Sequence, residues 1–314
     1  MTTIVAAAAR PVKERPGDRV FSSLTVFASG IILAVLAAVA IFLVIMSLPA
    51  FLAADEDFKG DATNFWSYVG PLVFGTIWAA ALAMIFAVPL AIGVALFITH
   101  FAPRRLAQGL GYVVDLLAAV PSVVFGLWGI GVLAPALQPV YTNLTEWFGW
   151  FPLFAGPVSG TGRTILTVAV VLAVMVLPII TAISREVFLQ TPRLHEEAAL
   201  ALGATRWEMI RMAVLPFGRP GVISGAMLGL GRALGETMAV AMVLSPATIY
   251  SFALLQSQNP TTIAANIALN FPEAHDVGVN ILIATGLILF VITLGVNSLA
   301  RYIVGRRKAF SGAN

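Results

Sequence analysis

Glu197-Ala-Ala-Leu-Ala-Leu-Gly203 lies in a polar segment, Arg185 to Arg219, that separates long apolar runs. Thr191 is a good N-cap and Pro192 suits the first helical position, so a helix is predicted to begin there. Gly203 suits the left-handed residue that ends many helices. The heptapeptide is therefore predicted to form most of a short helix that stops at Gly203.

A second helix is predicted directly after this turn. Thr205-Arg-Trp-Glu208 has the form of a capping box, in which the threonine accepts from the Glu208 amide and the glutamate reaches back. The polar segment therefore reads as helix, glycine turn, helix.

The composition of the chain is that of a membrane protein. Of its 314 residues, 59% are hydrophobic and 11% are charged, whereas about a quarter of the residues in a soluble domain are charged. There is no cysteine, which excludes disulfides and thiolate metal sites. An all-α membrane protein is expected, since helices satisfy their own backbone groups in lipid.

The apolar runs indicate six membrane-spanning helices, because about twenty residues cross a bilayer. The first run is longer than the apolar core of a signal peptide, so it is expected to be retained. The predicted organisation is a cytoplasmic tail at 1–23, a first helix at 24–48, a permease-like core at 70–303 and a cytoplasmic tail at 304–314. The six helices are expected near residues 24–48, 70–99, 112–137, 164–188, 217–245 and 278–303.

Most of the 18 basic residues fall on one side of these six helices. They occupy the N-terminal tail, the loop with Arg104 and Arg105, the segment 185–219 and the C-terminal tail. Basic loops stay on the cytoplasmic side of a membrane. Both termini and the polar segment are therefore expected to be cytoplasmic.

Two charged residues, Arg232 and Glu236, lie inside the fifth apolar run. Arg232 follows Arg219 by 13 residues, or roughly 20 Å of helix, so it is expected deep in the bilayer. A charge there costs at least about 2.5 to 3.5 kcal/mol. The two residues are one helical turn apart, which predicts a shared face and permits an ion pair.

This charged face allows two interpretations. A buried ion pair that only fixes helix packing is the simpler one. The other is a substrate pathway, because the donor fork of arginine matches a tetrahedral oxyanion. Gly225 and Gly229 continue the same face and predict close approach of another helix.

Several chemistries are excluded or disfavoured. The phosphate-binding motif G-x-x-x-x-G-K-[ST] is absent, so any ATP would be hydrolysed by another subunit. His100, His195 and His275 are far apart in the sequence, which gives no indication of a metal site or a catalytic triad. We expect a protein that is not an enzyme.

The polar segment resembles the EAA loop of ABC importer permeases. Glu197, Ala198, Ala199, Gly203 and the Leu215-Pro216 pair occur at the spacing of that family. Ala213 departs from it, since isoleucine is usual there, and Ile210 lies one turn earlier. The resemblance implies a cytoplasmic coupling loop at 185–219 that docks on an ATPase subunit.

The fifth apolar run resembles the signature of PstC-type permeases of the phosphate-specific ABC importer. The matching stretch is G-L-G-R-A-L-G-E-T, Gly229 to Thr237, followed by M-A-V, and Leu116 to Gly126 also matches. The resemblance implies a type I importer permease fold in the bacterial plasma (inner) membrane. It assigns Arg232 and Glu236 to the phosphate pathway, of which this subunit would form half.

The same resemblance implies the partners. They are a second, PstA-like permease, two PstB-like ATPase subunits that hold ATP and Mg, and an extracytoplasmic PstS-like phosphate-binding protein. Membrane lipid is also expected, and nucleic acid is not. No cofactor is expected in this chain.

Three alternatives remain open at this point. The first is an ABC permease for another solute, such as sulfate, molybdate or an amino acid. The second is a proton-coupled secondary carrier that uses Glu236 as its relay. The third, a membrane scaffold without transport, is disfavoured by the buried charges.

Overall fold

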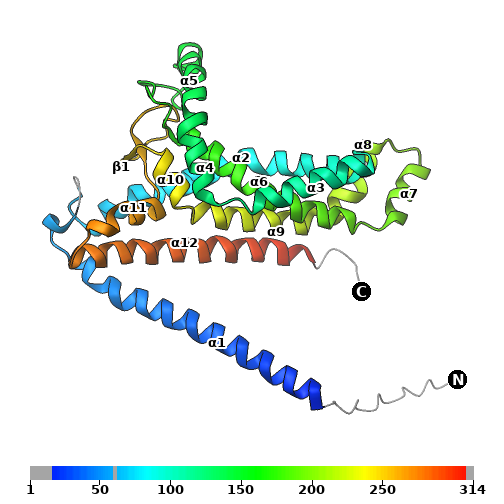
Figure 1. The fold of residues 1–314 in the computed structure, drawn as a ribbon, viewed down its shortest axis with the longest axis horizontal. Coiled ribbons are helices and arrows are strands. Elements are labelled where there is room, and N and C mark those ends of the chain that lie inside the picture. Colours follow the sequence, from blue (N-terminus) through cyan, green and yellow to red (C-terminus); the bar gives the residue numbers. More distant parts are fainter. Residues whose placement is uncertain (1–15, 59–61, 309–314) are drawn as a thin grey trace.

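The computed structural model describes residues 16–58 and 62–308, which are mostly helical (Figure 1). Short 3₁₀ turns at Leu48–Phe51, Asp55–Asp57 and Phe271–Glu273, and π-helical turns at Phe97–Phe101, Gly129–Leu133 and Ile210–Val214, join or extend the helices. The helices are α1 (Pro16–Ser47), α2 (Phe65–Leu96), α3 (Arg104–Ala118), α4 (Ser122–Trp128), α5 (Ala134–Phe148), α6 (Ile165–Leu189), α7 (Arg193–Ala201), α8 (Arg206–Met209), α9 (Leu215–Leu234), α10 (Met238–Val243), α11 (Ile263–Asn270) and α12 (Val277–Lys308).

The prediction of an all-α membrane protein is confirmed. Six helical stretches among the described residues are long and apolar enough to cross a membrane: Gly17–Phe51, Phe65–Phe101, Ser122–Phe148, Ile165–Leu189, Arg206–Leu234 and Val277–Tyr302. The first and last helices are longer than predicted, since α1 begins at Pro16 and α12 reaches Lys308. Of the predicted tails, residues 1–15 and 309–314 lie outside the described residues. Lys59, a basic residue between the first two membrane-spanning helices, also lies outside them.

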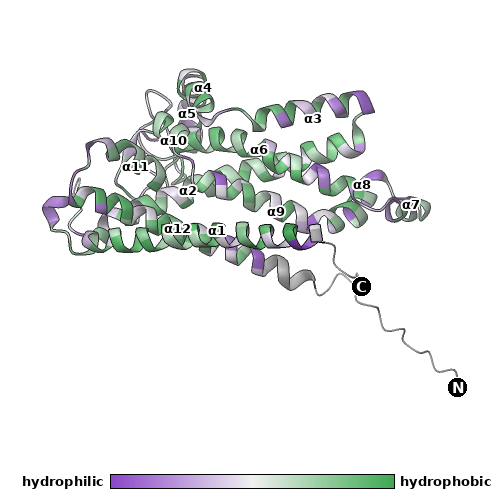
Figure 2. Ribbon diagram, turned by 60° about the horizontal axis from the view of Figure 1, so that its bottom comes forward, coloured by the Kyte–Doolittle hydropathy of each residue, from purple (hydrophilic) through white to green (hydrophobic). Residues whose placement is uncertain are grey.

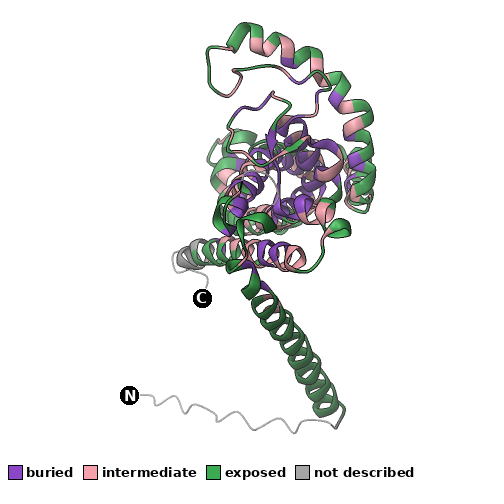
Figure 3. Ribbon diagram, turned by 90° about the vertical axis from the view of Figure 1, so that its left-hand side faces the viewer, coloured by how far each residue is buried: buried purple, intermediate pink, exposed green. Residues whose placement is uncertain are grey.

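Helix α6 is the centre of the bundle, and α2 packs along it. Viewed from one end, the buried residues gather in the middle of the bundle (Figure 3). Ala83, Ala87, Ala91 and Ala95 of α2 repeat every four residues, and all four are fully buried. A stripe of such small side chains lets a neighbouring helix approach closely. In the most apolar stretch of 18 residues in α6, two-thirds of the residues are buried, whereas in the corresponding stretch of α1 only 6% are buried. Helix α1 diverges from α12 and stands apart from the bundle (Figure 1).

The single helix predicted over 112–137 is wrong. Helix α3 ends at Ala118, and Pro121 is extended, with φ −59° and ψ 140°. Proline cannot donate to a helix, and it disfavours helical backbone at the residue before it. Helix α3 runs beside α6, where Arg185 lies 3.7 Å from Asp115. Helix α5 then projects across the direction of the bundle (Figure 1).

Polar residues gather at the end of the bundle that carries α7 and α8 (Figure 2). The opposite end holds the segment between α10 and α11. There β1 (Pro246–Ala247) pairs in parallel with β2 (Asn259–Pro260), so the chain folds back toward the bundle before α11 begins.

Candidate functional site

Arg232 lies in the last turn of α9, which ends at Leu234. A cation is stabilised there by the partial negative charge of a helix C-terminus. The side chain is half-buried, and its Nε is shielded from solvent. Within the described residues, Arg232 has no hydrogen-bond or ion-pair partner. A buried guanidinium donor of this kind requires a partner from outside the chain, such as water or an anion.

Glu236 does not share a helix with Arg232, so the prediction of one continuous helix over 217–245 is wrong. The chain leaves the helix at Gly235 and resumes it at Met238. The Glu236 carboxylate is 8% exposed, and its Oε1 accepts a hydrogen bond of 3.1 Å from the Ala239 amide. Glu236 therefore caps the first turn of α10, and no ion pair joins it to Arg232.

The reason for this interruption is local. Glycine has the largest backbone entropy to lose in a helix, and Gly235 stands at the C-cap of α9. The first amides of the new helix then need acceptors, which the carboxylate of Glu236 supplies in part. The order glycine, carboxylate, threonine before Met238 is a cap pattern, but the spacing of four residues between Arg232 and Glu236 fits a continuous helix equally well.

The glycine face of α9 packs against α6. A Cβ added at Gly225 would lie 3.1 Å from Cβ of Ile183, and one at Gly229 would lie 2.9 Å from Cδ1 of Ile180. The close approach predicted for this face is therefore present. Both glycines are buried, so this face of α9 is occupied within the chain.

Another side of α9 is open. Leu228 is 58% exposed, Gly235 and Ser224 are exposed, and Met238 at the start of α10 is 44% exposed. Nothing would obstruct a Cβ at Gly231, beside Arg232. This open strip leads to the break in the helix, which the described residues leave uncovered on that side.

The predicted turn of the polar segment forms as expected. Gly203 has a φ of +87°, in the left-handed region. The Thr205 amide donates to Glu208 Oε2 at 2.7 Å, and the Glu208 amide donates to Thr205 Oγ1 at 3.3 Å. The capping box is therefore confirmed. Helix α7 begins one residue later than predicted, because Pro192 is the N-cap and Thr191 is buried without a cap role.

Helix α7 is held to the bundle by few contacts. Its Glu197 and Ala198 are exposed, whereas Ala199 packs on a cluster with Ile210 and Phe188. Isoleucine was expected at the position of Ala213. Ile210, which lies one helical turn earlier, is fully buried. Helix α8 continues without interruption through the π-helical turn Ile210–Val214 into α9. The second helix of the polar segment and the helix that carries Arg232 are thus continuous.

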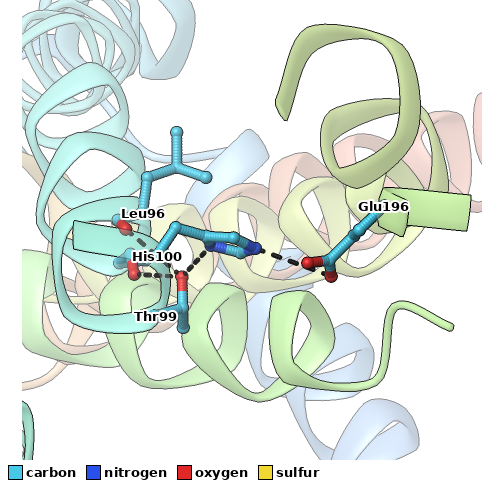
Figure 4. Close-up of polar contacts among 5 residues, drawn as sticks. Leu96, Thr99, His100 and Glu196 are labelled. Atoms are coloured by element: carbon cyan, nitrogen blue, oxygen red, sulfur yellow. Dashed lines mark hydrogen bonds and ion pairs between the residues drawn. The ribbon is translucent and has the colours of Figure 1, made fainter. Parts of the chain in front are cut away.

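A contact that sequence reasoning missed joins α7 to the end of α2. His100 Nε2 lies 3.8 Å from Glu196 Oε1, and His100 Nδ1 lies 2.6 Å from Thr99 Oγ1 (Figure 4). The two residues are far apart in the sequence, and neither belongs to a recognisable motif. Among the described residues, no group of histidine and acidic side chains is arranged to hold a metal ion.

Comparison with known proteins matches residues 87–309 to the family model described as "Binding-protein-dependent transport system inner membrane component". The phosphate transport system permease protein PstC 2 of Mycobacterium tuberculosis is 45% identical, and the match covers 96% of this chain and 95% of that protein. The chain belongs to this permease family. The phosphate transport system permease protein PstC of Mesorhizobium japonicum is 41% identical over 94% of this chain and 92% of that one.

Solved structures of ABC importers share the fold of this permease. A bacterial alginate ABC transporter in complex with its pentasaccharide-bound periplasmic protein has a TM-score of 0.57 at 17% identity, covering 93% of this chain and 98% of that one. The inward-facing MetNI methionine ABC transporter has a TM-score of 0.54 at 16% identity, with 75% and 95% covered. The permease therefore has the type I importer fold, and it is a multi-pass transport subunit, not an enzyme.

Two further residues of the permease were not singled out from its sequence. Arg163 donates to three carbonyl groups at the end of α10, and the buried Asn259 ties the returning segment to the start of α6. No sequence pattern links positions so far apart.

Proposed function

We propose that this chain is the PstC-type permease subunit of an ATP-driven importer of inorganic phosphate. It forms half of the translocation pathway, and a PstA-like permease forms the other half. The observation that carries the proposal is the guanidinium of Arg232 at the break of a membrane helix, which has no partner among residues 16–58 and 62–308. The 45% identity to a relative named as a phosphate transport permease supports the choice of substrate.

The chemistry of the break suits an oxyanion. Arginine keeps its charge at any working pH and binds phosphate oxygens with two parallel N–H donors. The open strip beside Leu228 and Gly235 gives such an anion access to Arg232. Glu236, held at the start of α10, adds a negative charge nearby that keeps the anion from being trapped.

The polar segment 185–219 is the proposed docking site for one of the two PstB-like ATPase subunits, which bind ATP and Mg. Its exposed apolar side chains support this role: Leu194 is 73% exposed, Leu202 90% and Trp207 57%. Exposed apolar groups on a soluble surface mark sites of protein contact. In this proposal the segment and both termini lie on the cytoplasmic side of the membrane. ATP-driven movement of α8 then moves α9, since the two are continuous.

A PstS-like binding protein delivers phosphate at the opposite end of the bundle. The end of α5 and the loop after it present Trp147 and Trp150, which are 71% and 79% exposed. Tryptophan is enriched both at membrane interfaces and at protein contacts, and this end of the molecule therefore offers anchoring to lipid beside the delivery site.

Uptake of radiolabelled phosphate by proteoliposomes that contain all the subunits tests this function. Uptake should require ATP inside the liposomes and the binding protein outside, and excess sulfate or molybdate should not compete. Competition by either anion would identify a permease for another oxyanion. Uptake driven by a pH gradient without ATP would instead identify a secondary carrier.

A further inference from the structure

Helix α10 is held at its C-terminal end by a single distant side chain. Arg163 Nε donates to the carbonyl oxygen of Val243 at 3.2 Å, and Nη2 donates to those of Met242 and Leu244 at 3.2 and 2.9 Å. The last carbonyls of a helix have no partner within it, and a cation there complements the helix dipole. With Glu236 at the other end, α10 is capped by opposite charges at both ends.

Arg163 itself is fixed to the start of α6. Thr164, the next residue, is the N-cap of α6, and its side chain accepts from the Thr167 amide. Asn259 donates to the Arg163 carbonyl at 3.4 Å and accepts from the Ile165 amide at 2.9 Å. The guanidinium is thus attached to α6, the most buried of the membrane-spanning helices, and any movement of that end of α6 reaches α10 through it.

Close packing fixes how near α10 lies to the neighbouring helices. Its Ala239 and Val243 are buried and occupy the space over Gly126 of α4 and Gly129 of the following turn. The three hydrogen bonds from Arg163 add a polar attachment at its C-terminal end. A cavity of about 420 Å³ borders Arg163 beside Gln138 and Thr161. The guanidinium is therefore kept on the three carbonyls by its hydrogen bonds, and these define where α10 ends.

Helix α10 has only six residues, or roughly 9 Å of helix. A helix shorter than two turns moves as one body, so a shift at its end displaces its start at Met238 and the cap residue Glu236. We propose that Arg163 is a positioning residue for the translocation site, which sets the place of the break that contains Arg232 and Glu236. This inference rests on the proposed function and extends it to a residue outside the pathway.

The absence of cysteine from the chain permits a direct test with Met238→Cys as a reporter in the complete transporter, with cysteine-free partner subunits. The rate at which a water-soluble thiol reagent labels the reporter is measured in detergent, with Arg163 intact and with Arg163→Met or Arg163→Lys. We expect the reporter to be labelled about tenfold faster in Arg163→Met than with Arg163 intact. This factor corresponds to the free energy of one lost charge-assisted hydrogen bond. Lysine, which keeps the charge but not the fork, should give an intermediate rate.

Two controls make the result specific. Arg105→Met removes an exposed arginine of α3 and should leave the rate unchanged, and a Glu56→Cys reporter in the exposed turn Asp55–Asp57 should be labelled equally in all variants. Phosphate uptake should fall about tenfold in Arg163→Met, while copurification of the ATPase is retained. The tenfold fall in uptake also corresponds to the free energy of one lost charge-assisted hydrogen bond.

A labelling rate in Arg163→Met within about twofold of the parent would overturn the inference. If that variant does not accumulate in membranes, Arg163→Lys decides by the same criterion. The labelling assay needs no phosphate, so a wrong substrate assignment would abolish uptake in the parent and leave the labelling difference intact. The two proposals therefore fail separately.

Discussion

The molecule interrupts a helix at two glycines, Gly203 and Gly235, in very different surroundings. At Gly203 the break is exposed, and it is closed by neighbours in the sequence, chiefly the capping box of Thr205 and Glu208. At Gly235 the chain lies among membrane helices, and the short helix that follows is capped by Glu236 and by Arg163, which lies far away in the sequence.

The difference follows from the solvent. In water, freed amides and carbonyls are hydrated, so a break needs only local caps. In an apolar environment each unsatisfied group costs several kcal/mol, so the protein must supply every partner. Charged caps supply such partners to α10, whereas Nε of Arg232, at the end of α9, is a buried donor without a partner among the described residues. The buried break is thus suited to an anion, and the exposed one to a protein contact.

The largest effect is expected at the buried break, from Arg232→Leu. Two charge-assisted hydrogen bonds to an oxyanion are worth about 3 to 6 kcal/mol, so phosphate uptake should fall by at least about a hundredfold. Copurification of the other subunits should be unchanged, and Arg105→Leu should transport normally. Full uptake by an assembled Arg232→Leu complex would refute the pathway role.

The cap of the buried break should be next in effect. Glu236→Ala removes the side-chain acceptor of the Ala239 amide, and initial-rate uptake should fall about tenfold. Glu236→Gln keeps an oxygen and loses only the charge, worth about 0.3 to 1 kcal/mol at a helix N-terminus, so a two- to fivefold loss is expected. Glu146→Gln, on an exposed residue of α5, is the matched control. Equal losses in the Ala and Gln variants would show that the charge matters and the cap does not.

Gly203→Val tests the exposed break. A non-glycine residue in the left-handed region costs about 1 to 2 kcal/mol, and a Cβ there would meet no atom within 4 Å, so the penalty is purely conformational. Uptake and ATPase copurification should fall together, by about fivefold. Gly203→Asn should restore most of both, because asparagine tolerates this conformation. Equal impairment by valine and asparagine would show that backbone conformation is not the cause.

The smallest effect is expected from Thr205→Ala, which removes the capping box at the start of α8. The loss is local and exposed to water, so we expect about a twofold decrease in phosphate-stimulated ATP hydrolysis. Thr205→Ser retains the hydroxyl and should behave as the parent. A loss as large as that of Glu236→Ala would contradict the distinction between the two breaks.

The sequence predicted what local chemistry decides. Six apolar runs, the left-handed Gly203 and the Thr205 capping box all depend on residues within a few positions of each other, and the structure contains all of them. Gly225 and Gly229 were also placed correctly on a close-packed face, since the 3.6-residue period sets their direction.

The sequence did not predict features that depend on distant partners. The break at Gly235 was missed because a spacing of four residues between Arg232 and Glu236 fits a continuous helix equally well. The caps of α10 come from separate parts of the chain, and Arg163 has no motif around it. The predicted helix over 112–137 failed for a local reason, because α3 ends at Ala118 and the extended Pro121 separates it from α4.

Thiol labelling of Arg232→Cys in the assembled transporter, whose other subunits lack cysteine, tests the central claim most directly. If residue 232 borders an aqueous route for the anion, a water-soluble reagent should modify the cysteine during the ATP cycle, and phosphate should slow the reaction. A cationic reagent should also restore part of the uptake that a neutral one does not. A cysteine that stays unmodified throughout the cycle, in an otherwise assembled and ATP-hydrolysing complex, would contradict the account.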